Sequence, residues 1–348
     1  MQTRRNLIKQ TAAGIFAAAL MAPGLLQAQE SFTFSLADSL PTTHYTYDIT
    51  QEWIKLLEER SDGRIKIVHY PAGQVASAQD MLDAIQNRIA DIAYLPVQYF
   101  AEKMPLATVG SLPIPELQPS VEALDRAYLE LGKGILDEAE MRDAGVRVVR
   151  ASTTSYYNIH MKTKKIEKLE DLTGMKIRVG GNVQQTTVQA LGGIPVTMVP
   201  PEMYNALQNG TLDGTVFSLP SVNSYKLDDL LKYSTNNLNL GVFATYFAMN
   251  RELWESLPED IRTIFDEVGE EIIAHESSVV EGLSEEYISK FRDRGLDIYD
   301  LEPEVLAEIT ERLNPIREEW TQLYSDRGLP AQEVVDQWVA LLKKHGGN

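Results

Sequence analysis

The chain has 348 residues, a formal net charge of −18 and no cysteine. Nucleic acid and anionic membrane surfaces both attract clustered Lys and Arg, so the acidity argues against either as a partner. The lack of cysteine excludes disulfides, iron–sulfur clusters and cysteine-ligated zinc. An apolar share of 44% is enough for a packed core in one large or two ordinary domains.

Residues 1–28 have the plan of an export signal. The basic head TRRNLIK precedes an apolar run that Pro23 interrupts, and small residues around Ala28 offer a cleavage site. The paired arginines favour a twin-arginine signal over an ordinary secretory one. The run is also shorter than the roughly 20 residues that span a bilayer. We therefore expect a periplasmic protein with no direct membrane insertion.

The next part of the chain alternates between strand and helix patterns. Strands are predicted at 31–37, 64–70 and 91–95, with helices at 47–60 and 78–88 between them. A long helix at 121–141 and a strand at 145–151 follow. This order is typical of a parallel sheet that is covered by helices.

A second block of the same kind follows residue 151. Its predicted elements are strands at 176–179, 195–199 and 215–218, and helices at 184–191 and 202–208. From Pro258 onward the pattern is helical, with helices predicted at 259–271, 275–294, 303–324 and 331–344. Two α/β blocks in one chain predict two lobes with a cleft between them.

Ligands of open α/β sheets bind at the carboxyl ends of the strands. Five residues are predicted at such ends, namely His44, Tyr94, Arg178, Phe217 and Ser218. Enzyme signals are largely missing, because the sequence holds no G-x-S-x-G, P-loop, H-E-x-x-H or strand-linked G-x-G-x-x-G motif. The five histidines show no metal-ligand spacing, so no metal and no cofactor is implied.

Arg178 stands out in the stretch GMKIRVGGNV, at the end of a short predicted strand. A guanidinium is a rigid fork of donors that fits a carboxylate with two hydrogen bonds. Gly180 and Gly181 lack side chains, so a ligand could approach the backbone beside it. From the residues alone, a structural salt bridge to a nearby Asp or Glu is the favoured explanation of Arg178.

Several motifs extend over nearly the whole predicted mature chain. They are SDGRI at 61–65, PAGQ at 71–74, LEDLTGMKIRV at 169–179, LGGIPV at 191–196, PEMYNALQNGTLDG at 201–214 and AMNRELWESLP at 248–258. In order and spacing the sequence resembles the solute-binding proteins of tripartite ATP-independent periplasmic (TRAP) transporters, the DctP-type family.

The resemblance implies a two-lobed α/β fold of the type II periplasmic binding proteins, a Venus flytrap with long C-terminal helices. Residues 31–150 and about 242–280 would form lobe I, and residues 151–241 and about 281–348 would form lobe II. The protein would be no enzyme. It would capture a small organic acid by closing its lobes and deliver it to the small and large subunits of a TRAP permease.

The resemblance also assigns the carboxylate-gripping role to Arg178. Members that bind sialic acid have a second arginine where this chain has Asn158, so a ligand of that kind is not expected. In the run SYYN at 155–158, alternation predicts that either Tyr157 or Asn158 together with Tyr156 faces the cleft.

Further cleft candidates are Gln98, which would tune the fit, and Tyr246, which would add aromatic surface or else pack in the core.

Three other functions fit parts of the pattern. One is a binding protein for an ATP-driven importer, which the spacing around Arg178 and Asp213-Gly214 disfavours. Another is a periplasmic enzyme that acts on a sugar acid. The third is a receptor partner for a sensor kinase, which would share the fold and the ligand.

Overall fold

The structure is a computed structural model that describes residues 30–114, 117 and 119–346. The predicted export signal at 1–28 therefore lies outside the described residues. Within the described part, no helix combines the length and apolar character that a membrane crossing requires.

The first of two sheets has five strands in the order β2-β1-β3-β10-β4. Its strands are β1 (Phe32–Ala37), β2 (Ile65–Tyr70), β3 (Ile92–Leu95), β4 (Val146–Thr153) and β10 (Ala244–Asn250). β1 runs parallel to β2 and β3, whereas β10 is antiparallel to β3 and β4. The helices of this part are α1 (Thr46–Arg60), α2 (Met81–Gln86) and α3 (Val121–Lys133).

The second sheet has six strands in the order β11-β9-β5-β8-β6-β7. Its strands are β5 (Asn158–Met161), β6 (Lys176–Val179), β7 (Ile194–Thr197), β8 (Gly214–Phe217), β9 (Tyr233–Thr235) and β11 (Asp297–Tyr299). β6 is parallel to both of its neighbours, β7 and β8. The helices of this part are α4 (Asn182–Ala190), α5 (Pro200–Gln208) and α6 (Leu219–Ser224).

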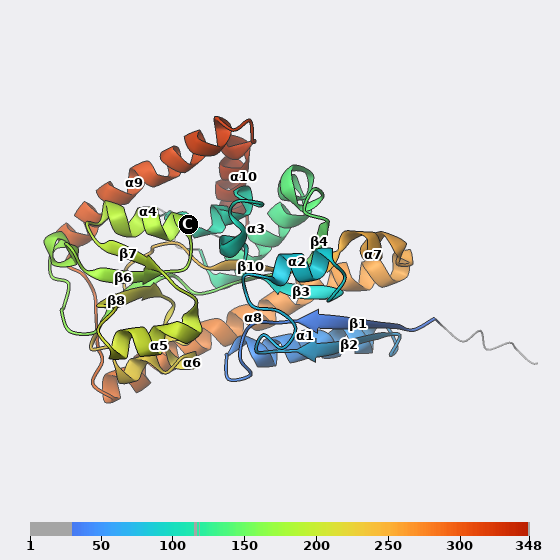
Figure 1. The fold of residues 1–348 in the computed structure, drawn as a ribbon, viewed down its shortest axis with the longest axis horizontal. Coiled ribbons are helices and arrows are strands. Elements are labelled where there is room, and N and C mark those ends of the chain that lie inside the picture. Colours follow the sequence, from blue (N-terminus) through green and yellow to red (C-terminus); the bar gives the residue numbers. More distant parts are fainter. Residues whose placement is uncertain (1–29, 115–116, 118, 347–348) are drawn as a thin grey trace, which may run out of the picture. The chain divides into compact units, whose positions relative to one another are not determined.

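Helices make up most of the described chain after β10, with the short strand β11 among them (Figure 1). They are α7 (Arg251–Ser256), α8 (Glu259–Asp293), α9 (Pro303–Ser325) and α10 (Ala331–Lys344). α8 packs against α1, α3 and β4 of the first lobe and against α6 and β11 of the second, whereas α9 packs on α4 and α10 on α3. Two mixed α/β lobes with long C-terminal helices are thus confirmed, while the exact lobe boundaries stay a prediction.

Some elements differ from those predicted. The helices expected at 259–271 and 275–294 are one 35-residue helix, α8, because no helix-breaking residue separates them. The helix expected at 121–141 ends at Lys133, and a single π-helical turn, η3 (Asp137–Met141), follows. β10 escaped prediction since all seven of its residues are buried, which removes the period-two alternation of a half-exposed strand.

Gly269 explains how α8 docks on the first sheet. A Cβ atom at this position would lie 2.1 Å from the carbonyl oxygen of Val149 in β4. Only glycine allows so close an approach of the helix to the strand backbone. The contact brings the following turns of α8 beside the end of β4, where Glu276 meets Arg150 and Ser152.

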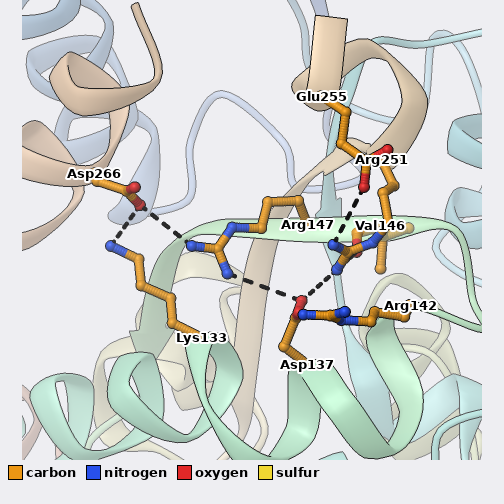
Figure 2. Close-up of polar contacts among 8 residues, drawn as sticks. All are labelled: Lys133, Asp137, Arg142, Val146, Arg147, Arg251, Glu255 and Asp266. Carbon is orange, nitrogen blue, oxygen red and sulfur yellow. Dashed lines mark hydrogen bonds and ion pairs between the residues drawn. The ribbon is translucent and has the colours of Figure 1, made fainter. Parts of the chain in front are cut away.

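A charge cluster fastens η3 to β4 and α7 (Figure 2). Asp137, whose side chain is 5% exposed, pairs with Arg142 at 3.0 Å, with Arg147 at 3.8 Å and with Arg251 at shorter range. Arg251 also donates to the carbonyl oxygen of Val146 in β4 at 2.7 Å. One buried carboxylate therefore joins three arginines from three different segments.

Candidate functional site

A cavity with about 420 Å³ of empty space, counting its open side, lies between the two lobes. The first lobe contributes His44 and Tyr45 from the start of α1, Tyr94 from β3 and Ser152 from the end of β4. The second lobe contributes Arg178 from β6, Phe217 from β8, and Ser221 and Tyr225 from α6 and its end. The carboxyl ends of β3, β6 and β8 thus converge here, as expected for an α/β sheet.

Arg178 is 1% exposed and sits in a sheet between β7 and β8. Its Nε donates to the carbonyl oxygen of Met198 at 2.8 Å, and its guanidinium carbon lies 5.1 Å from the ring centre of Phe217. Nη1 is buried and has no hydrogen-bond partner. No Asp or Glu in the described part of the chain forms an ion pair with it. The structural salt bridge that the sequence left open is therefore not seen among these residues.

Arg150 shows what a neutralised buried arginine looks like in the same molecule. It is also inaccessible to solvent, and its Nη2 pairs with Glu276 at 2.8 Å. Its guanidinium carbon lies 4.4 Å from the ring centre of Phe247. Burying an unpaired charge is costly. Unlike Arg150, Arg178 thus has no carboxylate partner among the described residues.

Aromatic rings form a large part of the remaining wall, beside several serine and threonine residues. Phe243 and Tyr157 lie nearly parallel with ring centres 6.5 Å apart, and Phe217 meets the edge of Tyr157 at 5.8 Å. Tyr225 continues the series, with its ring centre 6.0 Å from that of Phe217 and 5.8 Å from that of His44.

His44 adds a neutral donor. Burial lowers the pKa of His44 to about 3, so its ring is uncharged at neutral pH. Its Nδ1 accepts the backbone N–H of Thr46 at 3.3 Å, which places the ring proton on Nε2. Arg178 is then the only charged side chain among the described residues that line the cavity.

Comparison with known proteins identifies the family. Residues 36–323 match the model of the bacterial extracellular solute-binding protein family 7, DctP. The chain belongs to this family. The C4-dicarboxylate-binding periplasmic protein DctP of Rhodobacter capsulatus is 23% identical over 279 residues, which are 77% of this chain and 80% of that protein.

Solved structures of TRAP solute-binding proteins share the fold. One from a marine metagenome, specific for aromatic acid ligands and solved with 3-hydroxybenzoate, has a TM-score of 0.83 at 24% identity over 91% of this chain and 99% of its own. Another from Rhodoferax ferrireducens, solved with benzoate, has a TM-score of 0.82 at 24% identity over 90% and 98%. These matches confirm the predicted type II binding-protein fold.

The protein is therefore a periplasmic TRAP solute-binding protein of the DctP family, as its sequence predicted. The family consists of binding proteins rather than enzymes, so the reading as a sugar-acid enzyme is set aside. Among the described residues, no cluster of His, Asp and Glu has the arrangement of a metal site.

Five of the predicted binding residues line the cavity of the TRAP solute-binding protein. They are His44, Tyr94, Tyr157, Arg178 and Phe217. Tyr157 faces it while Tyr156 and Asn158 are absent from the lining, which is one of the two patterns that strand alternation allowed.

Four other predicted residues lie outside the cavity lining. The amide oxygen of Asn158 accepts hydrogen bonds from the Leu238 backbone N–H at 3.2 Å and from Thr235 Oγ1 at 3.1 Å. Gln98 donates to Ser111 Oγ at 3.0 Å, and Ser218 donates to Ser221 Oγ at 2.7 Å. The Asn158 oxygen, the Gln98 amide nitrogen and the Ser218 hydroxyl are thus bonded within the protein, whereas the buried Oε1 of Gln98 has no hydrogen-bond partner.

Tyr246 is the fourth, and it belongs to the core. Its ring stacks on Tyr128 with centres 4.2 Å apart, and its hydroxyl donates to the carbonyl oxygen of Tyr128 at 2.8 Å. A Cβ atom at Gly132 would lie 2.7 Å from this ring, so glycine makes room for it. Of the two readings that the sequence allowed for Tyr246, the structure has core packing.

Sequence reasoning missed much of the polar wall. Tyr45, Ser152, Thr153, Thr245, Ser221 and Tyr225 line the cavity but were not singled out. The run Ser152–Thr154 closes β4, so the strand-end rule that found Arg178 applies to it as well. Tyr225 follows a short helix that the sequence did not indicate, and it carried no signal of its own.

Proposed function

We propose that this TRAP solute-binding protein captures an aromatic monocarboxylate between its lobes, with the ligand carboxylate bound to Arg178. The observation that carries the proposal is the state of Arg178, which is buried, has no acidic partner among the described residues and keeps Nη1 without a hydrogen bond. A carboxylate would neutralise the charge and accept from the free edge of the guanidinium.

A single positive charge favours a ligand with a single negative charge. The described wall holds no second cation to receive another carboxylate, because His44 is neutral. Leaving a second carboxylate desolvated and unpaired would cost several kcal/mol, on the order of the penalty for one buried ion. A monocarboxylate avoids that penalty.

The rings of Tyr157, Phe217, Tyr225 and Phe243 favour an aromatic body in the ligand. The two structurally similar TRAP proteins solved with benzoate and with 3-hydroxybenzoate bind acids of this class, which supports the same choice here. Asn158 supplies no charge and is already bonded within its lobe, which argues against a sialic acid.

Delivery to a TRAP permease completes the proposal. The closed receptor would dock on the small and large membrane subunits and release the acid as its lobes part. The lobe boundaries predicted from the sequence, residues 31–150 with about 242–280 and residues 151–241 with about 281–348, would move against each other. Family membership supports this partner.

Calorimetric titration of the mature protein tests the ligand class. We expect benzoate and 3-hydroxybenzoate to bind with dissociation constants at least 100-fold below those of succinate and N-acetylneuraminate. Tight binding of succinate with no heat from either aromatic acid would overturn the proposal. Reconstitution of uptake with the candidate permease subunits in vesicles tests the delivery step separately, and receptor-independent uptake would refute it.

A further inference from the structure

Ser152 connects the cavity wall to a buried charged group behind it. Ser152 lines the cavity at the end of β4, and its Oγ lies 2.5 Å from Glu276 Oε1 of α8. The other oxygen of Glu276 pairs with Arg150 Nη2 at 2.8 Å, and both side chains of that pair are inaccessible to solvent. Glu276 is thus held as a carboxylate that can only accept hydrogen bonds.

This contact fixes the direction of the Ser152 hydroxyl. A hydroxyl has one proton and two lone pairs, and the proton of Ser152 is committed to Glu276. What remains for a ligand is a lone pair. Thr245, which also lines the cavity, donates its own proton to the carbonyl oxygen of Ser152 at 2.9 Å and likewise has only lone pairs left.

Ser152 and Thr245 of the first-lobe wall can therefore only accept hydrogen bonds from a ligand, whereas Arg178 on the second lobe donates them. The acceptor wall also carries little net charge. Glu276 is balanced by Arg150, and burial together with the nearby charge of Glu276 raises the pKa of Asp125 well above its usual range. A neutral donor suits Ser152 and Thr245 better than an ammonium group does, and a carboxylate cannot donate to them.

We propose that Ser152, oriented by Glu276, makes the protein select aromatic acids that carry a hydroxyl group away from the carboxylate. This rests on the proposed function, since it adds a second contact to a ligand already held by Arg178. The carboxylate binds the second lobe and the hydroxyl donates to Ser152 of the first lobe. One ligand molecule then bridges both lobes, because it accepts hydrogen bonds from Arg178 and donates one to Ser152.

A buried hydrogen-bond acceptor can select strongly for ligands that carry a hydroxyl group. A site built to accept a hydroxyl proton leaves its own acceptor desolvated when an analogue without that hydroxyl binds, and such analogues are rejected strongly. Fluorine is close to a hydroxyl in size but donates no proton. A fluoro-substituted acid therefore separates the effect of filling space from the effect of donating a hydrogen bond.

The first test needs only the wild-type protein. Dissociation constants are measured for benzoate, 3- and 4-hydroxybenzoate, 3- and 4-fluorobenzoate and isophthalate. We expect one hydroxybenzoate isomer to bind at least tenfold more tightly than benzoate and than its fluoro counterpart, and isophthalate to bind most weakly. Equal binding of the hydroxy and fluoro acids would overturn the inference while leaving the proposed function intact. No binding by any aromatic acid would overturn both.

The second test removes the acceptor. In Ser152→Ala the preference for the hydroxybenzoate over benzoate should fall to within about twofold, while the dissociation constant of benzoate itself stays within about threefold of wild type. Ser221→Ala is the matched control, because it deletes a serine hydroxyl from the second-lobe wall of the same cavity. It should leave the ratio between the two ligands unchanged.

Comparison with Ser221→Ala also shows which results would contradict the role of Ser152. If Ser152→Ala and Ser221→Ala change the ratio equally, or if Ser152→Ala weakens both ligands in parallel, Ser152 does not select for the hydroxyl. Glu276→Gln tests the orienting role, since an amide can donate to Ser152 and free its proton. That variant should bind isophthalate at least threefold more tightly relative to benzoate, and an unchanged ratio in the folded variant would exclude the role of Glu276.

Discussion

Gly181 of the second lobe lies directly against Gln98 of the first. A Cβ atom built on Gly181 would be 2.9 Å from the Cβ of Gln98 and 3.4 Å from its carbonyl oxygen. Gly181 follows Arg178 at the end of β6, while Gln98 follows β3 in a short 3₁₀ turn. A close approach of the two lobes therefore occurs next to the proposed carboxylate site, and it depends on a missing side chain.

Gly181→Ala should weaken ligand binding with little effect on the unliganded protein. The added methyl group meets Gln98 only when the lobes are closed, and overpacking of this kind costs about 1–3 kcal/mol. Because binding and closure are coupled, the dissociation constant for benzoate should rise by about 5- to 150-fold. Titration calorimetry measures the change. The extended backbone of Gly181 accommodates alanine without strain, so the effect isolates the contact.

Gly282→Ala is the control for this substitution. Gly282 is an exposed residue in α8, and a Cβ atom there would meet nothing within 4 Å. Replacing glycine by alanine inside a helix stabilises it by about 1 kcal/mol. We expect a slightly higher melting temperature and unchanged binding. If Gly181→Ala also binds like the wild type, the lobes do not need this contact to close.

Substitutions of Arg178 test the ionic contact itself. Removing one partner from a buried ion pair costs about 3–5 kcal/mol, so Arg178→Ala should weaken benzoate binding by two to three orders of magnitude. Arg178→Lys keeps the charge but loses the planar fork, and its affinity should lie between the two. Arg126→Ala, which removes an arginine from a surface pair with Glu122, is the control. Binding by Arg178→Ala within threefold of wild type would exclude the assigned role.

The position of Arg178 could be predicted because its signal is local. A short strand that ends in a charged residue and two glycines places that residue at the carboxyl edge of a sheet, where ligands bind. Whether it has an acidic partner is a long-range property, and the sequence left it open. The same limit applied to Arg150, whose partner Glu276 is 126 positions further along the chain.

For the aromatic residues, in contrast, the sequence could not predict which of them line the cavity. Tyr157 and Tyr246 were both candidates for the cleft, but Tyr157 lines the cavity and Tyr246 stacks on Tyr128 in the core. Their difference depends on the register of β10, a strand buried along its whole length. A uniformly buried strand has no polar face to fix which side points outward, so periodicity cannot separate the two residues.

Asp137→Asn should destabilise the protein strongly. The substitution leaves Arg251, Arg147 and Arg142 without their shared carboxylate, and two of these side chains are mostly buried (Figure 2). Losing the buried partner of such a cluster costs about 3–5 kcal/mol of unfolding free energy. Urea denaturation measures it. Asp83→Asn breaks the exposed pair with Lys103 and should cost no more than about 1 kcal/mol. Equal effects of the two variants would contradict a structural role for the cluster.

His160 should make the fold sensitive to acid. Burial lowers the pKa of His160 to about 4, while its Nε2 donates to the carbonyl oxygen of Phe217 at 3.0 Å and its Nδ1 accepts from Ser234 Oγ at 2.9 Å. The folded protein therefore binds this proton less readily than the unfolded chain, whose histidine pKa is about 6.5. The stability from His160 is fully present above pH 6.5 and falls by roughly 3 kcal/mol as the pH drops to 4.

Substitution of this histidine isolates its share of the acid sensitivity. His160→Gln retains a donor for the Phe217 carbonyl but has no group that titrates, so its unfolding free energy should vary less with pH between 6.5 and 4 than that of the wild type. The exposed His275, replaced in the same way, serves as the control. Urea denaturation at several pH values gives the slopes. Parallel curves for wild type and His160→Gln would show that His160 titrates alike in the folded and unfolded states, since only a difference in bound protons makes stability depend on pH.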